Sequence, residues 1–256
     1  MRTSTSRIES RLCWLWAVVL AGLLASEGRV VAAPEPARLR VLWLTDSGFH
    51  DYTSLAPGLA ARLGEMTRAS LVINTNRAVM TNSQFAEGYD VVVYDLCFDD
   101  TDAPALKCAL GLIRAGKPAV LLHCSVHALR RFDHTPEECC GAPPGEPVHY
   151  PPLTVARTVE ASPILRGFPE RWTTPGGEMD RRIEIVAGAH ALLTAPHPRE
   201  GDLQVVCWSQ DYGRGRIFGL SLGHDPVTVA APEYQRLLAN GLLWATRRLP
   251  DETNSR

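Results

Sequence analysis

Three histidines stand where apolar segments of the β-strand type come to an end. His50 lies shortly after the first such segment, His123 ends a central one, and His224 follows the last. An imidazole changes its charge near neutral pH, so it can accept a proton from a substrate, return one or bind a metal ion. A lone histidine is most often a surface or core group. Three at separate strand ends are expected to meet, because parallel neighbouring strands end at the same edge of a sheet.

Further polar residues accompany these histidines. Glu178 lies in the glycine-rich stretch 175–179, and His149 lies in an irregular segment, 130–152, that is rich in proline, glycine, histidine and cysteine. We predict His123 and His224 as the catalytic centre, with Glu178 as a further acid or base. The predicted substrate contacts are His50, His149, Asp46, Phe49 and Asp225.

The same residue types could hold a divalent metal ion. Imidazoles and a carboxylate are common zinc ligands, and a site with three protein ligands leaves a position at which water is activated. The candidate ligands are His50, His123, His149 and His224, with Glu178 or Asp46 as the carboxylate. No H-x-H spacing is present, and His127, four residues after His123, is expected to point elsewhere after a turn. The sequence therefore leaves a metal cofactor undecided.

Cys124 offers a nucleophilic alternative. It lies one residue beyond the end of the central strand, next to His123 and near His127. A thiolate paired with an imidazole is a competent nucleophile. The turn lacks the flanking glycines of a tight nucleophile elbow, so a cysteine-dependent hydrolase or amidotransferase relative is the less favoured hypothesis.

The elements that must position these residues alternate between strand and helix patterns. The predicted strands are 39–45, 71–73, 90–95, 118–122, 154–159, 183–186, 191–194, 204–208 and 216–220, with a hairpin turn at 212–215. The predicted helices are 54–63, 103–115 and 232–248, with a helical turn within 162–168. This alternation predicts an α/β fold with a doubly wound, mostly parallel sheet, in which the closely spaced later strands pair antiparallel at one edge.

The N-terminal residues are typical of a signal peptide. Arginines precede an apolar run over 12–25 that is shorter than the roughly 20 residues needed to span a bilayer. Small residues stand at Val31 and Ala33, the positions that a signal peptidase reads. We predict a signal peptide over 1–33, a short linker over 34–37, one domain over 38–250 and a disordered tail over 251–256. The mature protein would work in the periplasm or be secreted, without membrane association; an uncleaved anchor is the alternative.

Composition narrows the class of partner. The formal net charge is −2, without a long run of one sign, which argues against nucleic-acid binding. A small molecule or another protein is the expected partner, and the sequence leaves open whether the chain forms a homo-oligomer. Six cysteines follow the predicted signal peptide, an even count that permits disulfides in an exported protein, and no CxxC pair suggests a zinc knuckle.

Several segments, taken in order, resemble one family, the ThuA-like (trehalose-utilisation) proteins. The resemblance spans residues 38–248 and is carried by 47–50, 116–118 with 121–123, 175–179, 212–218, 222–225 and 240–245. It implies a fold like that of the class I glutamine amidotransferases, with a flavodoxin-like sheet, and a role in sugar metabolism. The chain departs from the family pattern in two places. His123 is followed by Cys124-Ser125-Val126-His127 rather than by small residues. Met179 stands where the family usually has an aromatic or aliphatic residue followed by tyrosine. We expect substrate contacts in these loops to differ from the family pattern.

The resemblance and the histidines together predict an enzyme that acts on keto-sugars or oxidised glycosides. A keto group acidifies the neighbouring C–H bond, so an imidazole or carboxylate could remove that proton while a second group protonates a leaving oxygen. Hydration, elimination or hydrolysis, with or without a metal, would follow. The alternative is a non-catalytic sugar-binding or interaction module on the same scaffold.

Overall fold

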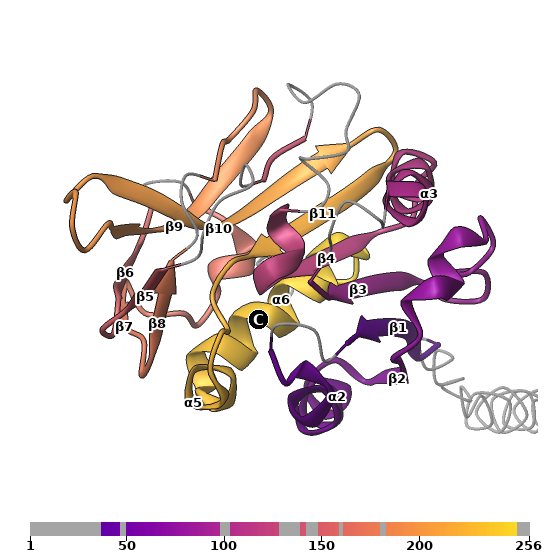
Figure 1. Ribbon diagram of the computed structural model, residues 1–256, viewed down its shortest axis with the longest axis horizontal. Coiled ribbons are helices and arrows are strands. Elements are labelled where there is room, and N and C mark those ends of the chain that lie inside the picture. The colour runs from indigo at the N-terminus through magenta and orange to yellow at the C-terminus, as the bar shows by residue number, and fades with distance from the viewer. Residues whose placement is uncertain are drawn as a thin grey trace, which may run out of the picture. The chain divides into compact units, whose positions relative to one another are not determined.

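The computed structural model of the chain describes residues 37–46, 50–97, 103–127, 139–141, 148–158, 161–179 and 183–249. The predicted signal peptide, residues 34–36 of the predicted linker, Phe49 and the tail over 251–256 lie outside these residues. The described elements are arranged around one large sheet (Figure 1). Among the described helices, none combines the length and the apolar character that crossing a bilayer requires.

Nine strands of the described residues form this sheet. In spatial order they are β2 (Ala69–Asn74), β1 (Leu39–Thr45), β3 (Val91–Asp95), β4 (Ala119–Leu122), β11 (Gly215–Leu220), β10 (Leu203–Tyr212), β9 (Ala189–Pro196), β6 (Thr154–Arg157) and β7 (Arg171–Thr173). Neighbours from β2 to β11 are parallel, and those from β11 to β7 are antiparallel. The long parallel run is confirmed. The antiparallel part, with β10, β9, β6 and β7, is nearly as large, so it is more than the edge that the sequence predicted.

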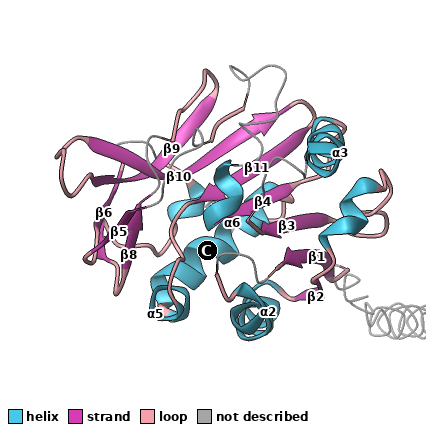
Figure 2. Ribbon diagram, viewed as in Figure 1, coloured by secondary structure: helices cyan, strands magenta, loops and turns pink. Residues whose placement is uncertain are grey.

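The parallel strands are continuous apolar runs because helices cover both faces of the sheet. Trp43 of β1 belongs to a buried cluster with Leu63 of α2 (Tyr52–Thr67) and Leu237 of α6 (Pro232–Ala245). Leu44, which points to the opposite face, belongs to a second cluster with Leu110 of α3 (Ala103–Arg114). Figure 2 shows these helices on the two sides of the sheet, with the short α5 (Pro226–Ala230) next to α6. The doubly wound arrangement is therefore present.

Short elements accompany this sheet in the part of the chain that the structure describes. They are the 3₁₀ turns η1 (Arg77–Thr81), η3 (His123–His127) and η4 (Pro163–Leu165), and a separate pair of strands, β5 (Val148–Tyr150) and β8 (Gly177–Met179). The strands β5, β7 and β8 and helix α5 were not predicted, because elements of three to five residues are too short to show a hydrophobic period.

The predicted strand over 183–186 is wrong. Of these residues only Glu184 forms a β-bridge, to Gly141. Ile183 is buried in the cluster beneath α3. The apolar run therefore reflects a side chain anchored in the core rather than a ladder of strand hydrogen bonds.

The strand order brings four strand ends to one edge. The order β2-β1-β3-β4, with β11 in the fifth place, is that of a flavodoxin-like sheet, whose topological switch point lies between β1 and β3. Since β1, β3, β4 and β11 are parallel neighbours, the residues that follow Thr45, Asp95, Leu122 and Leu220 all leave the sheet at this edge.

Helix α6 packs tightly against β11 at a glycine. A Cβ atom at Gly241 would lie 2.3 Å from Cδ1 of Phe218, a buried residue of β11. No side chain fits there without displacing the aromatic ring. Gly111, in the middle of α3, is exposed and has no atom within 4 Å of such a Cβ.

We predict opposite effects for alanine at these two glycines. Gly111→Ala should raise the free energy of unfolding by up to about 1 kcal/mol, because alanine favours a helix over glycine. Gly241→Ala gains the same preference but should lower the free energy of unfolding by about 1–3 kcal/mol, because Phe218 is forced from its place. Urea denaturation measures both values. Equal stabilisation of the two variants would show that α6 does not approach β11 this closely.

Candidate functional site

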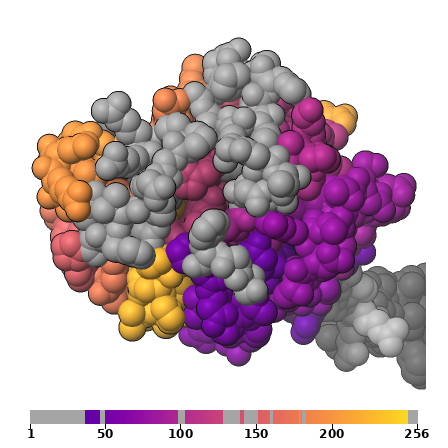
Figure 3. Space-filling model, in the orientation of Figure 1, coloured from indigo at the N-terminus to yellow at the C-terminus, as the bar shows by residue number. Residues whose placement is uncertain are grey.

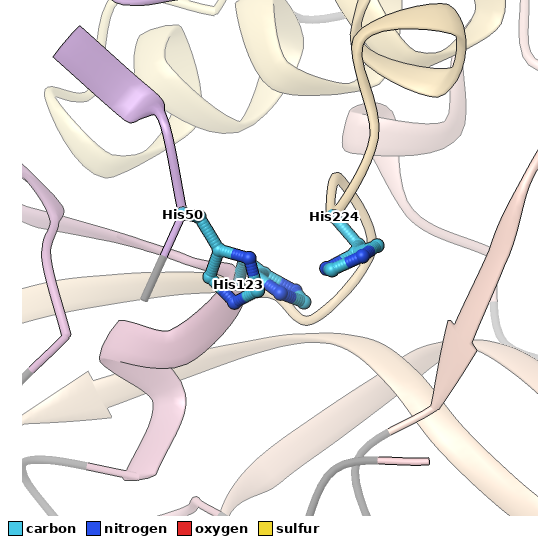
Figure 4. Close-up of side chains that lie close together, drawn as sticks. All are labelled: His50, His123 and His224. Atoms are coloured by element: carbon cyan, nitrogen blue, oxygen red, sulfur yellow. The ribbon is translucent and has the colours of Figure 1, made fainter. Parts of the chain in front are cut away.

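Three imidazoles meet at the edge where the parallel strands end (Figure 4). His50 follows β1, His123 follows β4 and His224 follows β11. The ring centroid of His50 lies 4.9 Å from that of His123 and 4.6 Å from that of His224, and the last two centroids are 5.4 Å apart. One ring nitrogen from each residue lies within 4.8 Å of the others. The convergence that the sequence predicted for these three side chains is present in the structure.

Two helix caps hold His50 and His224. Asp51, next to His50, caps α2 and accepts a hydrogen bond from the Ser54 amide at 3.3 Å. Asp225, next to His224, caps α5 and accepts one from the Thr228 amide at 2.8 Å. Helices α2 and α5 contact each other and lie side by side in the space-filling view (Figure 3). Their capped ends therefore present the two imidazoles to the same space.

His123 is the most constrained of the three. Its φ of 44° places it in the left-handed region, which non-glycine residues adopt at a cost. Its side chain is 1% exposed, and its Nδ1 lies 2.8 Å from the Ser221 carbonyl oxygen. A carbonyl oxygen only accepts hydrogen bonds, so we infer that Nδ1 carries the proton and that neutral His123 has its lone pair on Nε2. That nitrogen is then suited to take a proton or bind a metal ion.

A buried carboxyl group lies at the end of the neighbouring strand. Asp95, the last residue of β3, is 6% exposed, and burial raises its pKa to about 7. A hydrogen bond from the Trp43 indole Nε1, at 3.2 Å, opposes this rise, and the nearby Asp46 adds to it. Asp95 was not predicted as a site residue. The only sequence signal was its place at the end of a valine-rich strand.

For Glu178 and His149, two further predicted site residues, the structure gives the backbone position only. Glu178 and His149 are register partners on β8 and β5, and their side chains lie outside the described residues. The loop before β8 reaches the His224 segment, because the Gly176 amide donates a hydrogen bond to Thr228 Oγ1 at 3.2 Å. Figure 1 shows β8 on the same side of the molecule as α5. The structure thus joins the Glu178 loop to the helix that follows His224.

Two predicted substrate contacts have structural partners. Asp225 accepts hydrogen bonds from Thr228 with both carboxylate oxygens, one from the amide and one from Oγ1 at 2.7 Å. Asp46 lies 3.8 Å from the Arg77 guanidinium, and its side chain is 14% exposed. Asp225, next to His224, therefore caps a helix, and Asp46, four residues before His50, forms an ion pair.

The nucleophilic alternative gains no support from the backbone. In a nucleophile elbow the strained residue at the strand end carries the nucleophile. Here that residue is His123, and Cys124 is the second residue of η3. The Cys124 Sγ instead accepts a hydrogen bond from the Tyr52 hydroxyl at 3.3 Å.

Sequence comparison places the chain in a family. Residues 40–245 match the ThuA family, whose description is trehalose utilisation. The chain belongs to the ThuA family. The resemblance found in its motifs is thereby confirmed, and so is the family's association with carbohydrate utilisation. A comparison with curated proteins gives no match.

Solved structures with the same fold include other ThuA-like proteins. One from Parabacteroides merdae superposes with a TM-score of 0.67 at 18% identity, covering 86% of this chain and 94% of its own. One from Bacteroides uniformis gives 0.64 at 15% identity, covering 85% and 95%. The glutaminase domain of a Trypanosoma brucei CTPS, with bound acivicin, gives 0.52 at 12% identity, covering 80% and 94%. At these identities the likeness shows the fold alone, which is of the glutamine amidotransferase type.

The raised pKa of Asp95 predicts a pH-dependent stability. Between its usual pKa of 3.8 and about 7, the unfolded chain loses the proton while the folded chain keeps it, so stability falls as the pH rises through this range. Asp95→Asn removes this penalty and leaves an acceptor for Trp43. The stability gain of the variant should grow from pH 4 to 7 by roughly 2–4 kcal/mol and then level off.

Denaturant unfolding at several pH values measures this gain. Asp211→Asn, at a carboxylate whose side chain is 67% exposed, controls for the loss of one acidic group. A stability difference between Asp95→Asn and the parent protein that stays constant from pH 4 to 8 would show that Asp95 ionises as an exposed carboxylate does.

Proposed function

We propose that this ThuA-family chain is an exported enzyme that acts on sugars or glycosides carrying a keto group, with His123 and His224 as base and acid and His50 beside them as a substrate contact. The observation that carries the proposal is the meeting of His50, His123 and His224 at one edge of the sheet. Family membership supports the substrate class, since the family is described by trehalose utilisation. The flavodoxin-like strand order supports the position, because ligands of such sheets bind at this edge.

The chemistry needs one group that takes a proton and one that gives it. A keto group makes the hydrogen on the neighbouring carbon acidic. An imidazole that removes this proton lets the electron pair form a C=C bond as the next C–O bond breaks, and a second, protonated imidazole gives its proton to the leaving oxygen. His123 is assigned as the base, because its Nδ1–H is held by the Ser221 carbonyl oxygen. His224, which is half-buried and lies beside His123, is assigned as the acid.

The three histidines also suit a divalent metal. Their ring nitrogens lie within 4.8 Å of one another, and a histidine ligand commonly donates its other N–H to a backbone carbonyl, as His123 does to Ser221. A metal bound there would polarise the keto oxygen of the substrate. The proton transfers assigned to this chain's own residues do not depend on it.

Histidine variants test the proposal. With a disaccharide that carries one keto carbon as the substrate, His123→Gln and His224→Gln should each lower kcat at least about 100-fold, because each removes one proton-transfer group. His190→Gln changes an exposed histidine of β9 and should leave kcat unchanged. Chromatography with mass spectrometry follows the product.

A second readout examines the proton abstraction itself. In heavy water the active protein should introduce deuterium at the carbon next to the keto group, and His123→Gln should abolish this exchange. Calorimetric binding of the keto-sugar by the parent protein, with neither turnover nor exchange, would overturn the enzyme in favour of a sugar-binding module.

Export is a separate part of the proposal, and it rests on residues 1–33. When the full chain is produced in a Gram-negative host, the periplasmic fraction should contain a protein that begins at Pro34. Ala33→Arg should block this processing, because a signal peptidase requires a small residue there. N-terminal sequencing distinguishes the outcomes. Unprocessed protein in the cytoplasm would refute export, and unprocessed protein in the membrane would indicate an anchor.

A further inference from the structure

A second group of potential ligands lies beside the histidines. One ring nitrogen of His50 and the Sγ atoms of Cys97 and Cys124 lie within 4.8 Å of one another. Cys97 is buried, and the other two are half-buried. Three ligand atoms at this spacing need only small side-chain movements to surround one ion; in zinc sites, for comparison, the bonds to sulfur and nitrogen are about 2.0–2.3 Å long.

The backbone keeps the two thiols together. Cys97 follows β3 and Cys124 follows β4, and these strands are parallel neighbours. The Ser125 hydroxyl ties the two segments, because it accepts a hydrogen bond from the Leu96 amide and donates one to the Leu96 carbonyl oxygen, both at 2.9 Å. The residues next to the cysteines are thus bonded to each other. The closeness of the two sulfurs therefore follows from the pairing of β3 with β4 and from these two hydrogen bonds.

Tyr52 lies against all three of these potential ligands. Its hydroxyl donates to Cys124 Sγ at 3.3 Å and lies 4.0 Å from Cys97 Sγ. Its ring packs 5.1 Å from the His50 ring, between centroids. A phenol hydroxyl at this place can donate a hydrogen bond to a thiolate sulfur, as the groups around metal ligands commonly do.

We propose that His50, Cys97 and Cys124 form a second metal site, selective for a soft, thiophilic cation. Thiolate sulfur prefers such ions, whereas three imidazoles without sulfur suit borderline divalent ions. On binding, each thiol releases its proton to solvent, and the two thiolates and the neutral imidazole donate their electron pairs to the ion.

The two groups of potential ligands share His50. Its imidazole belongs both to the group with Cys97 and Cys124 and to the three-histidine cluster, so it can bind an ion in only one of them at a time. A soft cation held by the thiols draws His50 away from His123 and His224. The expectation that such a cation inhibits the enzyme rests on the proposed function. The binding of the cation does not depend on that function.

Cadmium(II) is a suitable probe, because a Cd–thiolate bond produces an ultraviolet charge-transfer absorption that Cd–imidazole bonds lack. When the reduced protein is titrated with Cd(II), this absorption should rise until one equivalent of Cd(II) per chain has been added. Cys97→Ser and Cys124→Ser should each weaken Cd(II) binding at least tenfold and lower the absorption, and His50→Gln should weaken binding while part of the absorption remains. His123→Gln should leave the absorption in place, which separates this test from that of the proposed enzyme.

Other cysteines supply the controls. Cys108→Ser, on α3, and the double variant Cys139→Ser/Cys140→Ser should retain the absorption. Circular dichroism checks the folding of each variant; if Cys97→Ser does not fold, Cys124→Ser, at a half-buried position, decides. The proposal is overturned by an absent charge-transfer absorption, by its persistence in Cys124→Ser, or by its loss in the Cys139/Cys140 variant.

Discussion

The hydrogen bond from His123 Nδ1 to the Ser221 carbonyl oxygen joins the ends of two parallel strands, β4 and β11. The left-handed backbone of His123 costs roughly 1–3 kcal/mol, and one hydrogen bond contributes only about 0.5–1.5 kcal/mol in net terms. At the middle of these two ranges the bond offsets about half of the strain, so the packing of the surrounding strand ends supplies the rest. Strain of this kind, held at one residue by its surroundings, is typical of functional positions.

The rigidity of that position comes from the two layers of helices. Ser221 is fixed in turn, since its amide donates to the Val206 carbonyl oxygen of β10 at 3.0 Å. Strand β4, which leads to His123, is buried along its whole length between the clusters beneath α2 and α6 and beneath α3. A base or metal ligand on such a support needs little reorganisation when a substrate or ion arrives. The antiparallel half of the sheet thus contributes to the site by anchoring Ser221, although it carries none of the three histidines.

The three histidines could be predicted from the sequence because their meeting depends only on topology. Once His50, His123 and His224 each follow a strand of one parallel run, the strand-end rule brings them together without any knowledge of side-chain directions. Asp95 could not be recognised in this way, since its raised pKa depends on how deeply the strand end is buried. Glu178 was predicted from its motif, but its register pairing with His149 was not, because β5 and β8 are too short to leave a periodic pattern.

The position of Cys97 beside Cys124 and His50 also could not be predicted from the sequence. In the sequence it is a small residue after a valine-rich strand, and 26 residues separate it from Cys124. Only the adjacency of β3 and β4, with the hydrogen bonds between Leu96 and Ser125, places the two sulfurs near His50. The edge of the sheet that collects imidazoles therefore collects thiols by the same rule. In the proposed pair of ligand groups, the presence or absence of sulfur would distinguish a soft cation from a borderline one.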